Sequence, residues 1–212
     1  MKTTLATLAL VALCIVGLFV WQSKAATAPI GQPGQPTVKI LLEQGHGSGV
    51  YIGQGLILTA AHVVANSKDG KVKIKTEGGN ILPGDVLWMS KDRDVALVRV
   101  IGTTGLKAAA LSCATPEYGQ MISARGSPGP VEFFTAWGHI AGTVKPFGPW
   151  LEAIPTDMTT IMGMSGGPVF NARGEVVGLV VGVLTVPIGF SASLTGIGVI
   201  VPGSTICTLL GR

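Results

Sequence analysis

The stretch MGMSGGPVFNARGEVVGLVVG, residues 162–182, decides the fold. It places Ser165 in the pattern Gly-Met-Ser-Gly-Gly, followed by a β-prone apolar run. Glycines let backbone N–H groups crowd a reacting carbonyl, which an acyl-transfer site needs. The pattern also suits a simple turn or the nucleophile elbow of α/β-hydrolases. An α/β-hydrolase needs an acid and then a histidine after the serine, but only one acid, Glu175, and no histidine follow. That class is excluded.

A serine nucleophile needs a histidine base, and the chain has three histidines. His62 follows the apolar run LILT, and two alanines before it leave space for an imidazole. His46 lies in the glycine-rich loop GHGSG, and His139 follows the strand-like AWG. We interpret these two as ordinary solvated or core side chains. His62 is therefore the candidate base.

A third group must orient the base and support the imidazolium. Asp94 opens the apolar run DVALVRV, where a carboxylate is costly unless it is paired. Asp92, two residues earlier in KDRD, is better interpreted as a turn residue. The candidate triad thus has the chain order His62, Asp94, Ser165.

The composition favours many short strands. Of 212 residues, 31 are glycine and only 12% are charged, which excludes a disordered chain, a coiled coil and a long-helix bundle. The formal charge of +4 is scattered, so nothing predicts nucleic-acid binding. Short helices are expected only after Thr59 and over 204–210. The spacing predicts an antiparallel sandwich or barrel, with strands at 37–42, 49–52, 56–59, 72–75, 95–100, 121–124, 133–138, 150–154, 176–184 and 196–201.

The N-terminus indicates export. A basic start precedes an apolar run over 5–21, so residues 1–25 are interpreted as a signal peptide or a signal anchor. Residues 26–36, ATAPIGQPGQP, form a Pro/Gly-rich linker. The domain that follows is expected to be extracytoplasmic, periplasmic or secreted, and either free or anchored by residues 5–21.

Four motifs together resemble a known family. They are GSGVYIGQGLILTAAHVV (47–64), DVALV (94–98), the serine stretch quoted above and GIGVIVP (196–202). In this order they are similar to trypsin-fold serine proteases, most closely the HtrA/Deg branch of bacterial envelope proteases. The resemblance covers about residues 37–210.

The resemblance implies an all-β fold of two six-stranded antiparallel barrels, with the active site in the cleft between them and a short C-terminal helix. The protease domain would span 37–212, with barrel one at about 37–110 and barrel two at about 118–203. Polypeptides would be the substrates, and no metal or cofactor is expected.

The same resemblance assigns roles to single residues. Ser165 would be the nucleophile, His62 the general base and then acid, and Asp94 the orienting carboxylate. The backbone N–H groups of Gly163 and Ser165 would form the oxyanion hole. The family often has asparagine at the position of Met164, which contributes mainly backbone.

The primary specificity pocket follows from the resemblance as well. Its walls come from the stretch before the serine and the strands after it, with candidate positions Thr160, Ile161, Val181, Val183 and Gly198. No acid lies at its base, and the branched Val183 should narrow it. We expect small aliphatic P1 residues to be preferred.

Two cysteines outside the N-terminal segment, Cys113 and Cys207, are a candidate disulfide in an oxidising compartment. The resemblance places Cys113 between the barrels and Cys207 in a C-terminal helix that packs toward that connection. Two buried free thiols are the alternative.

The sequence therefore predicts a serine endopeptidase that acts through an acyl-enzyme. The alternative is a catalytically silent binding module on a protease fold, tethered at the membrane. HtrA proteases normally continue into PDZ domains, whereas this sequence ends at Arg212, so recognition of peptide ends is not implied. The oligomeric state stays open.

Overall fold

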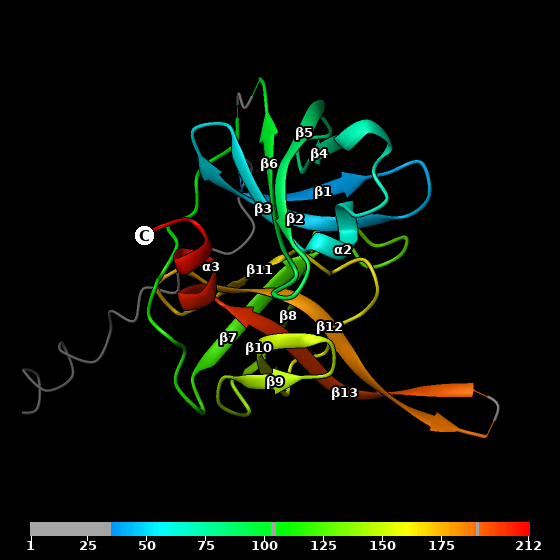
Figure 1. Cartoon of the computed structure of the whole chain (residues 1–212), viewed down its shortest axis with the longest axis vertical. Coiled ribbons are helices and arrows are strands. Elements are labelled where there is room, and N and C mark those ends of the chain that lie inside the picture. The colour runs from blue at the N-terminus through cyan, green and yellow to red at the C-terminus, as the bar shows by residue number, and fades with distance from the viewer. Residues whose placement is uncertain (1–34, 103–104, 190) are drawn as a thin grey trace, which may run out of the picture.

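A computed structural model describes residues 35–102, 105–189 and 191–212. The predicted signal or anchor segment and most of the predicted linker lie outside the described residues. The described chain forms two β-units, one above the other in Figure 1, with a short helix, α3 (Gly203–Leu209), beside their junction. Among the described residues, no helix is long and apolar enough to cross a membrane.

The first unit is a closed barrel with the strand order β1-β2-β3-β6-β5-β4. Alternation along a strand sends neighbouring side chains to opposite faces. In β4, for example, Val72 and Ile74 are buried, whereas Lys71 and Lys73 are exposed. The six strands are β1 (Thr37–Leu41), β2 (His46–Gly53), β3 (Leu56–Thr59), β4 (Lys71–Thr76), β5 (Ile81–Ser90) and β6 (Val95–Val100).

The second unit is a seven-stranded sheet with the order β8-β7-β11-β12-β13-β10-β9. Its own core contains Ile122, Ile154, Met158, Val169 and Ile200, all buried. The strands are β7 (Met121–Gly126), β8 (Phe134–His139), β9 (Lys145–Phe147), β10 (Trp150–Thr156), β11 (Pro168–Phe170), β12 (Val176–Ile188) and β13 (Ser191–Pro202).

The predicted all-β, two-unit fold is confirmed, with a difference in the second unit. That unit has seven strands, because the turn before β10 forms the extra strand β9. Its β8 and β10 ends meet only at an isolated bridge between Ile140 and Thr156. All the strands expected from the sequence are present, and the helix after Thr59 is α2 (Ala61–Val64).

Three strands were not predicted, for local reasons. β5 contains Pro83 and Gly84, which argue against a strand when only the sequence is considered. β9 and β11 have three residues each and begin near or with a proline, so their runs are too short to show alternation.

The β12–β13 hairpin projects away from the second unit (Figure 1). β12 pairs with β11 only as far as Leu179 and continues beyond it paired with β13. Within the described residues, the other edge of β12 from Val181 onward therefore carries no neighbouring strand. An extended chain can add to such an edge.

Contacts between distant segments tie the two units together. The Nζ atoms of Lys39 and Lys75, in barrel one, lie 3.0 and 2.7 Å from Glu132 carboxylate oxygens in the second unit. A disulfide joins Cys113, on the connection between the units, to Cys207 in α3, with the Cα atoms 5.6 Å apart. Ion pairs and a disulfide thus hold the two units together at their junction.

Candidate active site

His62 lies on α2, directly after β3. The other members of this short helix, Ala61, Val63 and Val64, are buried in the barrel. Their burial leaves the His62 side chain turned outward, with 49% of it exposed. The three buried residues therefore fix α2 on the barrel, and the His62 imidazole lies at the surface of barrel one.

Asp94 lies in the turn just before β6 and faces His62. Its φ of 53° is in the left-handed region, which Asp tolerates better than most residues. Its Oδ2 lies 2.7 Å from His62 Nδ1, and its Oδ1 accepts a hydrogen bond of 2.8 Å from the His62 backbone N–H. An ionised carboxylate only accepts hydrogen bonds, so Nδ1 carries the proton and Nε2 is left as the acceptor.

The environment of Asp94 favours its charged form. Burial by itself raises the pKa of this carboxyl, since only 5% of the residue is exposed. Hydrogen bonds and charge from His62, together with a hydrogen bond from Trp150, outweigh burial and hold the pKa of Asp94 below its ordinary value. The carboxylate is therefore ionised at neutral pH and can support an imidazolium.

The Ser165 loop lies between β10 and β11 and depends on its glycines. Gly163 and Gly166 have φ values of 97° and 80°, a backbone conformation that favours glycine. A side chain on Gly166 would collide with Thr59 Oγ1 and the Ser48 carbonyl, both in barrel one. Only glycine allows the serine loop of the second unit to approach the first so closely.

Ser48, on β2, holds this loop against barrel one through hydrogen bonds. Its hydroxyl donates to the Gly163 carbonyl at 2.7 Å and accepts from the Ser127 N–H at 2.9 Å. Its N–H donates to the Ser165 carbonyl at 2.8 Å. In the described part of the chain, the N–H groups of Gly163 and Ser165 donate to no protein acceptor, so both are available to an oxyanion.

One open cavity of about 630 Å³ joins these groups. His62, Ser165 and Gly163 line it together with His46, whose Nε2 lies 2.9 Å from the Ser127 carbonyl oxygen. The structure thus brings the predicted His62, Ser165 and Gly163 to one cavity and places Asp94 behind the histidine.

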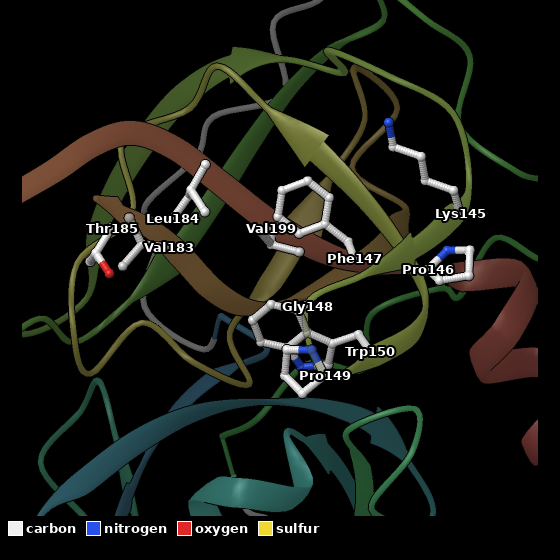
Figure 2. A pocket seen from close by; sticks show the side chains of 10 residues that line it. All are labelled: Lys145, Pro146, Phe147, Gly148, Pro149, Trp150, Val183, Leu184, Thr185 and Val199. Atoms are coloured by element: carbon white, nitrogen blue, oxygen red, sulfur yellow. The ribbon is translucent and has the colours of Figure 1, made fainter. Parts of the chain in front are cut away.

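Sequence reasoning missed two residues that hold this arrangement. Trp150, at the start of β10, donates from its indole Nε1 to Asp94 Oδ2 at 3.0 Å, and Figure 2 shows its side chain pointing toward barrel one. Ser48, described above, is the other. Their partners are 56 residues or more away in sequence, and no local pattern marks either residue.

His46 thus lines the cavity, whereas His139 and Asp92 do not. His139 pairs with Asp157 at 3.1 Å on the exposed surface. Asp92 stays in the turn, and its carbonyl accepts from the Leu151 N–H. Within the described residues, no group of three or more His, Cys, Asp or Glu side chains could hold a metal ion.

The five predicted specificity positions do not line one common pocket. Thr160 packs against the paired strands β12 and β13: its Oγ1 lies 3.3 Å from the Gly182 carbonyl oxygen, and its methyl group would touch a side chain on Gly198. Val181 is buried, and Ile161 is exposed. Val183 lines a different cavity, beside Trp150 (Figure 2). None of the five lines the cavity of Ser165, so this assignment stays a prediction.

Comparison with known proteins agrees with this geometry. Residues 47–179 match the trypsin-like peptidase domain. The chain is 31% identical to the mitochondrial serine protease HTRA2 of Drosophila grimshawi, over 69% of this chain and 35% of that protein. It is 33% identical to the serine protease HTRA1B of Danio rerio, over 63% and 29%. The chain spans about a third of the length of these relatives.

Other matches are less similar in sequence. A glutamyl endopeptidase of Staphylococcus epidermidis is 28% identical, over 63% of this chain and 52% of that protein. The crystal structure of the serine endoprotease from Yersinia pestis superimposes with a TM-score of 0.69 at 22% identity, covering 84% of this chain and 62% of that one. With a domain match over most of its described length and HtrA proteins among its relatives, the chain belongs to the trypsin-like peptidase family.

Proposed function

We propose that this chain is a serine endopeptidase whose triad is His62, Asp94 and Ser165. One observation carries the proposal: Ser165 shares a cavity with a histidine whose Nδ1 is held by a buried carboxylate. Beside the Ser165 hydroxyl, the backbone N–H groups of Gly163 and Ser165 donate to no acceptor among the described residues. Nucleophile, oriented base and oxyanion donors in one cavity are the parts that acyl transfer needs.

The first half of the reaction forms an acyl-enzyme. Ser165 Oγ attacks the carbonyl carbon of the scissile peptide bond while His62 Nε2 takes its proton. The negative oxygen of the tetrahedral intermediate accepts hydrogen bonds from Gly163 and Ser165 N–H. The imidazolium then gives its proton to the leaving amine, and the peptide C–N bond breaks.

The second half releases the acyl group with water. His62 Nε2 takes a proton from the water, whose oxygen attacks the acyl carbonyl, and the same N–H groups bind the new oxyanion. Proton return to Ser165 Oγ breaks the ester and restores the free enzyme. Asp94 stays ionised throughout and supports each imidazolium.

We propose that the substrate binds as an extended strand along the open edge of β12 from Val181 onward. The preference for small aliphatic P1 residues rests on the family resemblance, since Thr160 packs against Gly182 and Gly198 and does not line the cavity of Ser165. Cleavage sites in a peptide library test this preference. Strong cleavage after arginine or phenylalanine would contradict it.

An extracytoplasmic location is part of the proposal. It is supported by the apolar N-terminal sequence and by the disulfide between Cys113 and Cys207, because such bonds persist in oxidising compartments. Thiols counted on the unfolded, non-reduced protein without its N-terminal segment test the bond. No free thiol is expected. Two free thiols would contradict the disulfide and would remove its support for an extracytoplasmic location.

A fluorophosphonate that acylates reactive serines tests the function itself. We expect it to label the wild type and not Ser165→Ala, because only Ser165 is activated by His62. The matched control is Ser127→Ala, which removes another buried hydroxyl near the cavity and should preserve labelling. A folded wild type that is not labelled would favour the silent binding module instead.

A further inference from the structure

Trp150 connects a surface turn to Asp94. It is the first residue of β10, and its Nε1 donates to Asp94 Oδ2 at 3.0 Å, the same oxygen that lies 2.7 Å from His62 Nδ1. That one carboxylate oxygen is therefore shared between the imidazole and the indole. The two donors come from different β-units.

The backbone around Trp150 holds its ring in place. A side chain on Gly182, in β12, would lie 2.5 Å from the indole Cη2 atom, so the ring rests directly on this glycine. Figure 2 shows the ring beside Pro149, with Phe147 on the same turn and Val183 on β12. An open cavity of about 530 Å³ lies against these side chains.

We propose that Trp150 is a positioning residue for the proposed triad: it fixes the Asp94 carboxylate so that His62 keeps the orientation needed to activate Ser165. The inference rests on the proposed function. Gly182 is part of this arrangement, because the indole of Trp150 occupies the space that a side chain at position 182 would fill.

The physical reason lies in how few groups hold Asp94. Its carboxylate accepts from the His62 backbone, the His62 ring and Trp150. Without the indole, every remaining donor to Asp94 among the described residues belongs to His62, the residue that Asp94 is proposed to orient. Trp150 supplies an anchor that does not move with the imidazole.

The indole N–H also points the positive end of its dipole at Asp94, so it disfavours an added proton on the Asp94–His62 pair. Its loss should therefore move the acidic limb of kcat/KM to higher pH. A residue that only packs would lower stability or activity without moving this limb.

The test uses Trp150→Phe, which keeps an aromatic ring and removes the donor. The rate of acylation by a small sulfonyl fluoride is measured against pH, because this reagent does not need the peptide-binding edge. We expect acylation to fall about 10- to 100-fold, as for a lost hydrogen bond to a charged group, with the acidic limb displaced upward. With a peptide substrate, kcat should fall more than KM rises.

Two further variants keep the test independent of the folding of Trp150→Phe. Gly182→Ala substitutes neither Trp150 nor Asp94 but displaces the indole, because a side chain at 182 would lie 2.5 Å from its Cη2 atom, so it should cause the same two changes. The double variant with Trp150→Phe should be no slower than Trp150→Phe alone. Phe147→Leu changes the same turn without touching Asp94 and should stay within about twofold of wild type.

The outcomes separate the two proposals. A wild type that does not react with the sulfonyl fluoride overturns the proposed function. A reactive wild type with Trp150→Phe and Gly182→Ala both within twofold of it overturns only the role of Trp150. A loss of rate with an unmoved acidic limb also overturns that role, because it indicates packing alone.

Discussion

The described residues contain two histidine–aspartate ion pairs, and their comparison shows how the pair of the proposed triad differs from a surface pair. In both, histidine Nδ1 faces an aspartate oxygen, at 2.7 Å for His62–Asp94 and 3.1 Å for His139–Asp157. The histidine rings are similarly exposed. The carboxylates are not, because the Asp94 side chain is 6% exposed and that of Asp157 is 56% exposed. The environment of the acid distinguishes the pairs.

The neighbours explain the difference. Asp94 has Trp150 as an additional donor, and its histidine shares a cavity with Ser165. Asp157 follows β10 and accepts from the backbone and ring of His139, at the end of β8. Water screens this exposed pair. The pair links the end of β8 to the residue after β10, next to the isolated bridge between Ile140 and Thr156.

The largest effect should come from deleting each histidine. His62→Ala removes the base, and we expect peptide hydrolysis to fall by about 10⁵- to 10⁶-fold, as for other triads of this kind. His139→Ala should leave kcat/KM within about twofold, since the ring contacts no group of the cavity. Purified, folded variants assayed on one peptide give both values. Equal losses in the two variants would contradict the assignment of the base.

The aspartates should differ almost as much. Asp94→Asn keeps the shape but holds the imidazole in the wrong tautomer, which costs about 10⁴-fold in kcat for such triads. Asp157→Asn should be nearly neutral in kcat, as should Asp92→Asn. If Asp92→Asn were the inactive variant and Asp94→Asn active, the acid would be misassigned.

The sequence was most informative where a motif is local. Ser165 among its glycines, His62 after an apolar strand and Asp94 before one are each recognisable within a few residues, and their chain order is the basis of the roles proposed for them. Most strands followed from alternation and turns in the same way. The additional strand β9 and the proline-containing β5 did not, because their pairing is decided by neighbouring strands.

Residues that act across the junction left no such signal. Ser48 bonds to Gly163, 115 residues away, and Trp150 to Asp94, 56 residues away. A serine beside glycine and a tryptophan that begins a strand are common in many sequences. Their importance arises only when the two units pack together, which local patterns do not specify.

His46 offers an intermediate case, a histidine at the cavity whose Nε2 lies against a carbonyl oxygen, that of Ser127. It also lies against Gly163, where a side chain would come within 2.7 Å of its Nε2. We expect His46→Gln to lower kcat about 2- to 10-fold, because the loss of one hydrogen bond to Ser127 would loosen the backbone around Gly163. A loss as large as that of His62→Ala would show that nearness to the cavity outweighs pairing with a carboxylate.

The smallest difference should appear in the acid dependence of stability. The pKa of Asp94 in the folded protein lies below its ordinary value of 3.8. Its ionised form therefore stabilises the fold above that value, and the stabilisation is lost as pH falls through the lower folded value. Asp157 also has a lowered pKa, chiefly through the His139 backbone N–H, but its exposure to water reduces the effect on stability.

Urea unfolding from pH 6 to pH 2, in a Ser165→Ala background that prevents self-cleavage, measures the contribution of both aspartates. Asp94→Asn should flatten the acid loss of unfolding free energy more than Asp157→Asn does, because the Asp94 carboxylate is buried whereas that of Asp157 is exposed. The reverse order would mean that burial of the acid, on which the comparison of the two pairs depends, does not govern its energetics.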